Sequence, residues 1–465
     1  MHVKTNRLAI IAVCLVMTML VALTGCGSSS SSNSGSANAS QETGNPNDRA
    51  SNGQQTTSDE KVEISFMGHG DPNEKKIFTT LIQSFEKKYP NVKVNYTSVP
   101  PAEYHQKLTT LVASGKAPDI FYLSGPAFYK YAEAGTILNI QSYLDNTELF
   151  DPNNVWKQGL DRYRYDGKTL GTGDLYGLPK DVGPWAMAYN KDLFDEAGAE
   201  YPSAEPGGWT WDDYLKAAQA VTKDTNGDGK VDIFGGAGFP LEAAVWGNGG
   251  DYIDYATGTI KVDSPEFAEA MQFIADLNLK HHVSPSADDE KAMNSYSRFV
   301  AGKIGMFPLG PWDQPAFWDL PFNWDIAPWP ASPNTGKTST WLGSMGFALS
   351  SKSKHPQEAF NLAAFLSLDP EGQKQNMDLG QAVPNLIDMA TNDYLNNGKA
   401  PEHKQVFLDI IEYGRPTVEY GSKDTQWLDT FNQEASKVWT GKQTAAEFVK
   451  EIAPKLQELY DKGNK

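Results

Sequence analysis

The chain has 465 residues, a formal net charge of −18, 12 Trp and 20 Tyr. A surface this acidic argues against nucleic acid and anionic lipid as partners bound by charge, because both select for clustered Lys and Arg. The length is enough for about two or three lobes with large apolar cores, and the two cysteines, Cys14 and Cys26, are too few for a disulfide framework.

The first 25 residues have the pattern of a secretory signal peptide. A short basic segment with Lys4 and Arg7 precedes the almost wholly apolar run 8–23. The ending Leu-Thr-Gly-Cys26 resembles a bacterial lipoprotein signal, which implies removal of residues 1–25, lipid on the cysteine and attachment to the extracellular face of the cell membrane. The alternative is an uncleaved anchor, for which the run is short, since a spanning helix needs about 20 apolar residues.

The segment 26–60 consists mainly of Ser, Asn, Gly, Gln and Thr and contains few apolar side chains. Such a segment cannot bury enough apolar surface to offset the entropy of ordering it. We therefore expect a lipid-bearing Cys26 followed by a flexible tether that holds the rest of the chain near the membrane.

From residue 62 onward, strand and helix patterns alternate. The apolar spacing predicts, in order, strand 62–67, a helix through 77–85, strand 92–99, helix 102–114 and strand 119–123. This order is typical of an α/β fold in which helices cover a mostly parallel sheet. Ligands of such sheets lie beyond the carboxyl ends of the strands, which here are followed by His69, Asp71 and Ser124.

The later part of the chain has a different composition. Between Trp185 and Trp341 it is rich in Trp and in Gly-containing turns, whereas helical patterns dominate after residue 355. Apolar residues from Phe448 to Leu459 predict an amphipathic helix at the end of the chain.

Several segments of the chain, taken in order, resemble the extracellular solute-binding proteins of carbohydrate ABC importers, the maltose-binding-protein class. They are Ala117-Pro118-Asp119-Ile120 with the helix–Gly–Leu segment 131–138, the stretch 185–194, the run 299–306 with Gly310-Pro311-Trp312, and the stretch 440–447. The resemblance implies a type II-like periplasmic-binding-protein fold with two α/β lobes and a sugar in the cleft between them. It also implies a monomeric receptor that delivers an oligosaccharide to the permease subunits of an ABC transporter.

By segment, the resemblance places the first lobe at 60–182 plus 343–383 and the second at 183–335 plus 384–465. A receptor of this family needs no cofactor and catalyses no reaction. Two other classes stay open at this point: a secreted glycosidase, and an adhesin or sensor partner that binds sugar without transport. A glycosidase needs two carboxylates about 5 to 10 Å apart, and no motif singles out such a pair.

A sugar site needs flat aromatic surfaces for the ring faces and fixed polar groups for the hydroxyls. Trp312 follows a rigid Gly-Pro turn, and in the family this position often stacks on a sugar ring. Trp246 stands in a Gly-rich stretch with Asn248 and Asp251, while Trp185 and Trp341 lie near the expected crossings between lobes. The alternative for each Trp is packing in the core.

The polar candidates are His69, Asp71, Ser124, Asp181, Gly343, Ser344 and Asn385. Carboxylates are strong acceptors for hydroxyl groups, although Asp71 is equally suited to cap the following helix. Asp181 matches a sugar-binding Asp of the family, and Gly343-Ser344 resembles its Gly-Gly turn. Where several relatives have Pro-x-Arg, this chain has Pro384-Asn385-Leu386, so Asn385 replaces an arginine contact or leaves that subsite empty.

One loop resembles an EF-hand calcium site. Its ligand positions would be Asp224, Asn226, Asp228, Asp232 and the carbonyl of Lys230. The twelfth position, which should be a bidentate Glu, is Gly235. The prediction is a structural calcium, with a metal-free turn held by Asp and Asn side chains as the alternative.

Overall fold

The structure, a computed structural model, describes residues 61–123, 125–343 and 345–464. The predicted signal peptide, Cys26, the tether, Ser124 and Ser344 lie outside the described residues. All described residues fall in one unit, Ser58–Lys465. None of the helices in this part of the chain is long and apolar enough to cross a membrane.

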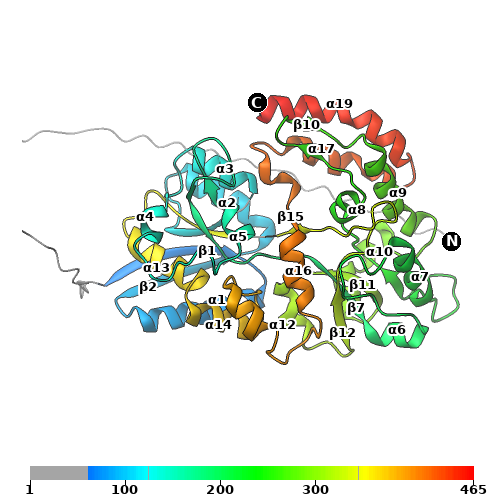
Figure 1. Cartoon of the computed structure of the whole chain (residues 1–465), viewed down its shortest axis with the longest axis horizontal. Helices are drawn as coiled ribbons and strands as arrows, with labels where there is room; N and C mark the ends of the chain where they lie inside the picture. Colours follow the sequence, from blue (N-terminus) through cyan, green and yellow to red (C-terminus); the bar gives the residue numbers. More distant parts are fainter. Residues whose placement is uncertain (1–60, 124, 344, 465) are drawn as a thin grey trace, which may run out of the picture. The chain divides into compact units, whose positions relative to one another are not determined.

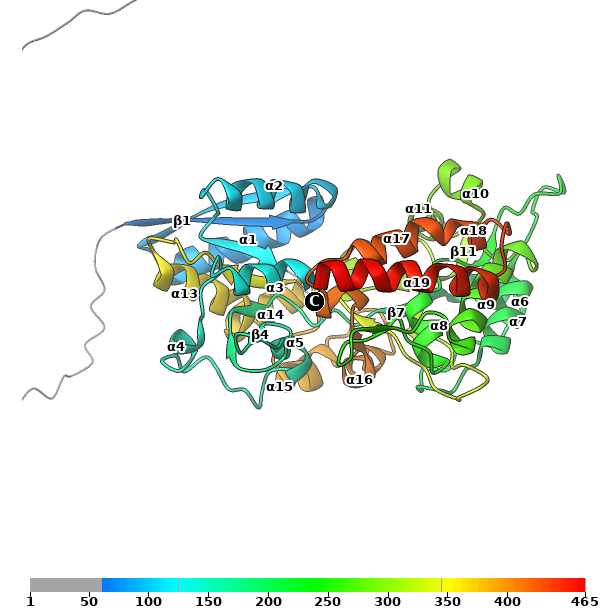
Figure 2. The same cartoon turned by 90° about the horizontal axis from the view of Figure 1, so that it is seen from above.

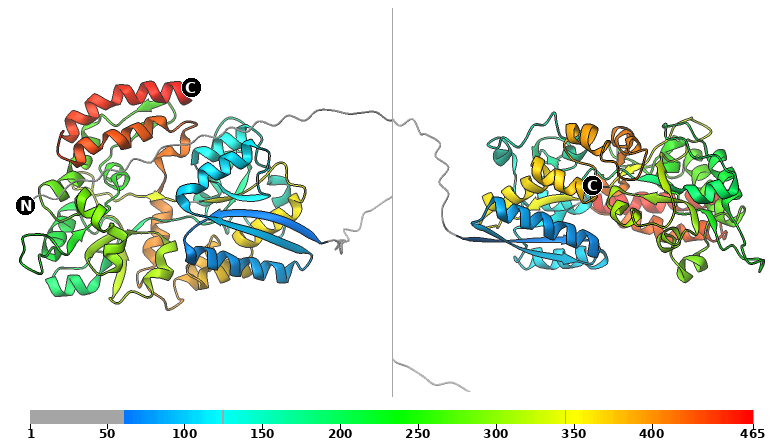
Figure 3. Two further views of the ribbon diagram at one scale, coloured as in Figure 1. Left: turned by 180° about the vertical axis from the view of Figure 1, so that it is seen from behind. Right: turned by 90° about the horizontal axis from the view of Figure 1, so that it is seen from below.

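The first of two main sheets has the strand order β2-β1-β3-β14-β6. Its strands are β1 (Val62–His69), β2 (Val92–Val99), β3 (Ile120–Leu123), β6 (Gly177–Pro179) and β14 (Gly346–Leu349). Four strands run in one direction and β14 opposes them. The blue strands β1 and β2 pair along their whole length (Figure 3). The three strands predicted between residues 62 and 123 are confirmed, with ends that shift by at most two residues.

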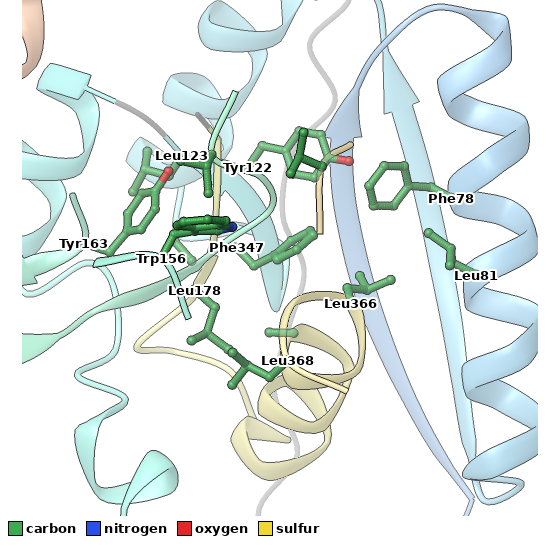
Figure 4. Close-up of a cluster of buried hydrophobic side chains, with 14 of the residues drawn as sticks. Phe78, Leu81, Tyr122, Leu123, Trp156, Tyr163, Leu178, Phe347, Leu366 and Leu368 are labelled. Atoms are coloured by element: carbon green, nitrogen blue, oxygen red, sulfur yellow. The ribbon is translucent and has the colours of Figure 1, made fainter. Parts of the chain in front are cut away.

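Helices cover the first sheet and close its core. α1 (Pro72–Lys88) begins at Asp71, whose side chain accepts from the N–H of Glu74 at 2.8 Å, and α2 (Pro101–Ala113) follows β2. The buried face of α1, with Phe78 and Leu81, packs near the Tyr122 and Phe347 rings and α13 (Pro356–Ser367) (Figure 4). Spacing at three and four residues puts these apolar side chains on one face, which explains why α1 lies against the sheet.

The second sheet has the strand order β12-β7-β11-β8. Its strands are β7 (Ala186–Asn190), β8 (Phe234–Gly236), β11 (Ile304–Leu309) and β12 (Trp324–Ala327). Three strands again share one direction, and β7 opposes them. Helices α8 (Leu241–Gly247) and α9 (Pro265–Leu279) contact each other, and the predicted terminal helix is α19 (Ala445–Asn464), which lies beside α17 (Gln426–Glu434) (Figures 1 and 2).

Two segments connect the sheets and meet at a pair of glycines. The chain leaves β6 and enters β7 through residues 180–185, and it returns from β12 to β14 through β13 (Trp341–Leu342). The N–H of Gly343 donates to the carbonyl of Gly183 at 2.8 Å. Gly183 has φ +56°, and a Cβ there would lie 1.8 Å from the Gly343 carbonyl oxygen. Any larger residue would therefore separate the two crossings.

The predicted lobe boundaries stay a proposal. The strands of the first sheet lie within 60–182 plus 343–383, and those of the second sheet lie within 183–335. β15 (Arg415–Pro416) pairs with β13 beside the crossings, so the late segment 384–465 reaches the connection between the two sheets.

Candidate ligand-binding site

Strand ends of both sheets open onto one pocket of about 410 Å³, here named the main pocket. The first sheet supplies the loop after β1 and the start of α1, and the first crossing follows β6. The second sheet supplies the short helix Pro311–Asp313 that follows β11. The side chains that line it include His69, Asp71, Lys180, Asp181, Trp312 and Asp313. Five of the predicted residues therefore lie at one pocket beyond strand ends, as expected for an α/β sheet. They are His69, Asp71, Asp181, Trp312 and Gly343.

Two smaller pockets are linked to the main pocket by shared lining residues. The Arg162 pocket, of about 260 Å³, shares Gly343 with the main pocket. The Trp246 pocket, of about 110 Å³, shares Pro416, Thr417 and Tyr420 with the Arg162 pocket. We treat the three pockets together as one candidate site, here named the ligand groove, because a series of neighbouring pockets suits a chain of linked units better than one small molecule.

Three predicted tryptophans stack along the ligand groove. The ring centroid of Trp185 lies 5.5 Å from that of Trp312 and 4.7 Å from that of Trp341, with interplanar angles of 26° and 20°. Trp312 lines the main pocket and Trp341 lines the Arg162 pocket, whereas Trp185 is absent from the linings. A Cβ on Gly310 would come within 2.3 Å of the Trp312 ring, so this glycine permits the indole position.

A buried ion cluster fixes the floor of the main pocket. Lys180 Nζ lies 3.1 Å from Glu74 Oε1 and 2.9 Å from Asp181 Oδ2. Burial alone would lower the pKa of Lys180, but the two carboxylates raise it above its ordinary value. Burial also raises the pKa of Glu74, against the opposing effect of Lys180. The cluster holds Asp181 in one orientation at the pocket, which is what hydroxyl recognition requires.

His69 is a neutral polar group at the pocket. Burial, helped by the positive charge of Lys180, lowers the pKa of its imidazole to about 4. Its ring packs edge-on against Tyr104, at a centroid distance of 4.9 Å. The Nδ1 atom is buried and has no partner among the described residues, whereas the residue as a whole lines the main pocket.

Two carboxyl groups face the same pocket from the two sheets. Asp71 caps α1, so the alternative role considered for it is observed, and it also lines the main pocket. Burial raises the pKa of Asp313 to about 7, with the charge of Asp71 acting in the same direction and the N–H of Gly310 opposing the shift. Asp313 is therefore partly protonated near neutral pH and can donate as well as accept.

We predict that Asp313 makes folding stability depend on pH. Between its ordinary value of 3.8 and about 7 the folded form keeps a proton that the unfolded form releases, so stability falls as pH rises through this window. Thermal unfolding of Asp313→Asn against wild type from pH 4 to 8 checks this. The variant is expected to lose part of that slope, and an identical slope in both proteins would contradict the assignment.

The Trp246 pocket ends the ligand groove. Trp246 Nε1 donates to Asp251 Oδ1 at 3.1 Å, and Arg415 Nη2 lies 2.7 Å from Asp251 Oδ2. The Arg415 guanidinium also lies 4.4 Å from the Trp246 ring centroid. Because Arg415 covers one face of the indole, Trp246 offers the ligand at most its other face or edge.

Two predicted contacts lie away from the ligand groove. Asn248 is 1% exposed and donates to the carbonyl of Glu266 at 2.8 Å and to Glu269 Oε2 at 3.0 Å. Asn385 is 0% exposed and donates to the carbonyl of Pro179 at 2.8 Å. Neither residue lines the groove, which corrects the expectation that they contact a ligand: both hold backbone segments together.

The calcium-like loop is arranged as a self-capped turn. Asp224 accepts from the N–H groups of Gly227 and Gly229 at 2.7 and 2.8 Å, and Asp232 accepts from Thr225. The side chains of Asn226 and Asp228 each accept from the N–H two residues later. These oxygens accept from the backbone and no acid stands at the twelfth position, so we propose the metal-free turn rather than the calcium site.

A chelation experiment tests this loop. Because its oxygens already have backbone partners, excess EDTA is expected to leave the unfolding temperature unchanged within about 1 °C, since no bound ion adds stability. Asp224→Ala is expected to lower the unfolding temperature equally in calcium and in EDTA, because it removes the acceptor for the N–H groups of Gly227 and Gly229. A drop on chelation that the Asp224→Ala protein lacks would instead establish bound calcium.

A larger pocket of about 650 Å³ lies at α6 (Lys191–Ala197) and the segment 395–404. Charged side chains line it, and its Lys191 and Glu402 already pair at 3.6 Å. It contains no residue of the first crossing and none of the three stacked tryptophans. We therefore place the binding site at the ligand groove rather than at this pocket.

Sequence reasoning missed much of the polar lining. Asp313 follows Trp312 and Lys180 precedes Asp181, so each stands next to a residue that was predicted to bind the ligand. Arg162 and Glu419 had none, because they come from segments more than 250 residues apart that meet only in the fold. Gln381, whose buried Nε2 has no partner among the described residues, also lines the main pocket.

Comparison with known proteins identifies the family. Residues 70–374 match the model of the bacterial extracellular solute-binding proteins. An arabinooligosaccharide-binding protein of Halalkalibacterium halodurans is 25% identical over 316 residues, 64% of this chain and 66% of that protein. A maltotriose-binding protein of Pyrococcus abyssi is 25% identical over 346 residues, 71% of this chain and 70% of its own length.

Solved structures confirm the expected two-lobed α/β fold. An ABC substrate-binding protein of Listeria monocytogenes, solved with cycloalternan, has a TM-score of 0.76 and 28% identity and covers 87% of this chain and all of its own. The GacH receptor of Streptomyces glaucescens, solved unliganded and with acarbose, has a TM-score of 0.72 and 20% identity over 86% of this chain and 99% of its own. The chain belongs to the bacterial extracellular solute-binding proteins.

Proposed function

We propose that this protein is the receptor of a carbohydrate ABC importer, which captures an oligosaccharide in the ligand groove and delivers it to the membrane permease. The observation that carries the proposal is the groove itself: stacked tryptophans beside carboxylates and a neutral imidazole, at the strand ends of both sheets. The names of the related proteins, which bind arabinooligosaccharide or maltotriose, support the same ligand class.

The proposed binding mode uses each group for one feature of a sugar. Trp312 and Trp341, which line the main pocket and the Arg162 pocket, pack on the apolar C–H face of a ring. Asp181, held by Lys180, accepts from a pair of hydroxyls, and His69 exchanges one further hydrogen bond. None of these roles changes a covalent bond, so we infer a binding protein rather than an enzyme.

We further propose that lipid on Cys26 keeps the loaded receptor beside its permease. The tether 26–60 ends just before β1, which begins at Val62, so the folded part follows the tether directly. Mass spectrometry of the mature N-terminus checks this: a diacylated Cys26 is expected, and an intact Met1 would overturn the anchor without affecting sugar binding. We also propose that the protein is a monomer, as the family resemblance implies. Sedimentation of the protein without its signal peptide and lipid-bearing cysteine measures the oligomeric state.

Calorimetry against a panel of mono- and oligosaccharides tests the main proposal. Saturable binding of an oligosaccharide, with a change in tryptophan fluorescence from the stacked indoles, is expected. Absence of binding across the panel would overturn the carbohydrate assignment. Chromatography of the same mixtures distinguishes the alternative class, because hydrolysed product would identify a glycosidase.

A further inference from the structure

Arg162 is a buried cation that the fold leaves without a counter-ion. It follows the short helix α5 (Lys157–Asp161) and is 6% exposed. One guanidinium N–H donates to the carbonyl of Leu342, while Nε is buried without a partner among the described residues. No described carboxylate forms an ion pair with it, and Asp181 and Glu419 act on it only by longer-range attraction. A buried charge in this state is unfavourable unless something else meets it.

The unpaired guanidinium lines a cavity with a carboxylate elsewhere on its wall. The Arg162 pocket contains Arg162, Glu419, Trp341 and Tyr420. Tyr420 donates to the carbonyl of Asp161 at 3.1 Å, which joins the segment that carries Glu419 to the end of α5. The volume of about 260 Å³ lies just below the range of drug-sized pockets, which begins at about 300 Å³, and suits one ring.

The surroundings favour a neutral ligand unit in this cavity. Arg162 and Glu419 contribute opposite charges to the same lining without forming an ion pair, and Asp181 adds negative charge nearby. A carboxylate-bearing unit would meet both acids. Hydroxyl groups suit the arrangement better, because a guanidinium only donates, a carboxylate only accepts, and a hydroxyl does both. Trp341, which stacks on Trp185 and lines this pocket, offers aromatic surface to a sugar ring.

We propose that the Arg162 pocket is a second sugar subsite, in which Arg162 donates to and Glu419 accepts from hydroxyl groups of a neutral unit linked to the one in the main pocket. This inference rests on the proposed function and deepens it. Arg162 then determines specificity for chain length, because a ligand that fills only the main pocket does not reach it. It supplies an arginine contact from a segment far from the Pro-Asn-Leu stretch at 384–386.

Matched di- and trisaccharides test the subsite. Affinities of wild type and Arg162→Met for maltose, maltotriose, arabinobiose and arabinotriose are measured by calorimetry. In the series that wild type binds, Arg162→Met is expected to lower the affinity for the trisaccharide by about 10- to 100-fold, which corresponds to one charge-assisted hydrogen bond. The affinity for the disaccharide should fall by less than about threefold. Equal losses on both lengths, or no loss, would overturn the subsite.

Two further variants keep the test independent of folding. Arg164→Met makes the same change at an arginine that pairs with Asp161 outside the groove, so affinity should not change. Glu419→Gln should reproduce the length-dependent loss even if Arg162→Met folds poorly. Removal of an unpaired buried charge should leave the unfolding temperature of Arg162→Met unchanged or higher. If wild type itself binds no sugar of the panel, the proposed function fails first and the subsite with it.

Discussion

Replacement of Trp312 by alanine is expected to weaken oligosaccharide binding by about 30-fold or more, the loss typical of a central aromatic contact. Trp312 lines the main pocket and stacks on Trp185, so the change removes a flat surface and also frees its neighbour to move. Trp312→Phe, which keeps a smaller ring, should retain part of the affinity. Calorimetry with the best ligand of the sugar panel measures both.

The control for this experiment is a tryptophan of similar exposure outside the ligand groove. Trp439, in α18 (Ser436–Trp439), is half-buried and absent from the groove lining. Trp439→Ala should leave affinity unchanged, while both alanine variants keep the far-ultraviolet spectrum of wild type. Unchanged affinity in a folded Trp312→Ala protein would remove Trp312 from the site and move the stacking role to Trp341.

Local patterns in the sequence predicted the elements that carry the site. The alternation at 62–67 and the helical spacing from Ile77 to Phe85 correspond to β1 and α1, so the loop between them could be assigned to a strand end. From that assignment His69 and Asp71 followed directly. The Gly-Pro turn before Trp312 similarly indicated an indole that is held in position by backbone rather than by core packing.

Contacts between distant segments could not be predicted in the same way. The Trp185–Trp341 stack and the Arg162 pocket each combine residues more than 150 positions apart, and no local spacing encodes such meetings. The prediction that Asn248 contacts a ligand was wrong because a local pattern was misleading, not because a distant contact was hidden. Its Gly-rich neighbourhood indicated room for a ligand, but the amide satisfies backbone and carboxylate groups in a buried position. A buried amide is commonly retained for that structural role.

Replacement of Lys180 by methionine is expected to destabilise the protein by about 3–5 kcal/mol, because it leaves Glu74 and Asp181 buried without their shared cation. Lys374→Met is the matched control. Lys374 pairs with Asp378 at 2.8 Å, but both side chains are more than half exposed, and such a pair is worth about 0–1 kcal/mol. Urea unfolding of the two variants beside wild type measures the difference.

The pH dependence of Lys180→Met separates a lost charge pair from lost packing. Burial already raises the pKa of Glu74, and without Lys180 nothing opposes that effect. The folded variant then keeps a proton that the unfolded chain releases, so its stability falls as pH rises above the ordinary value for a carboxyl group. The deficit against wild type should therefore be smaller at pH 5 than at pH 8, and Glu74→Gln added to Lys180→Met should recover part of it. A deficit that is the same at both pH values would mean that the lysine stem, packed near the Phe78 and Tyr122 rings, matters more than its charge.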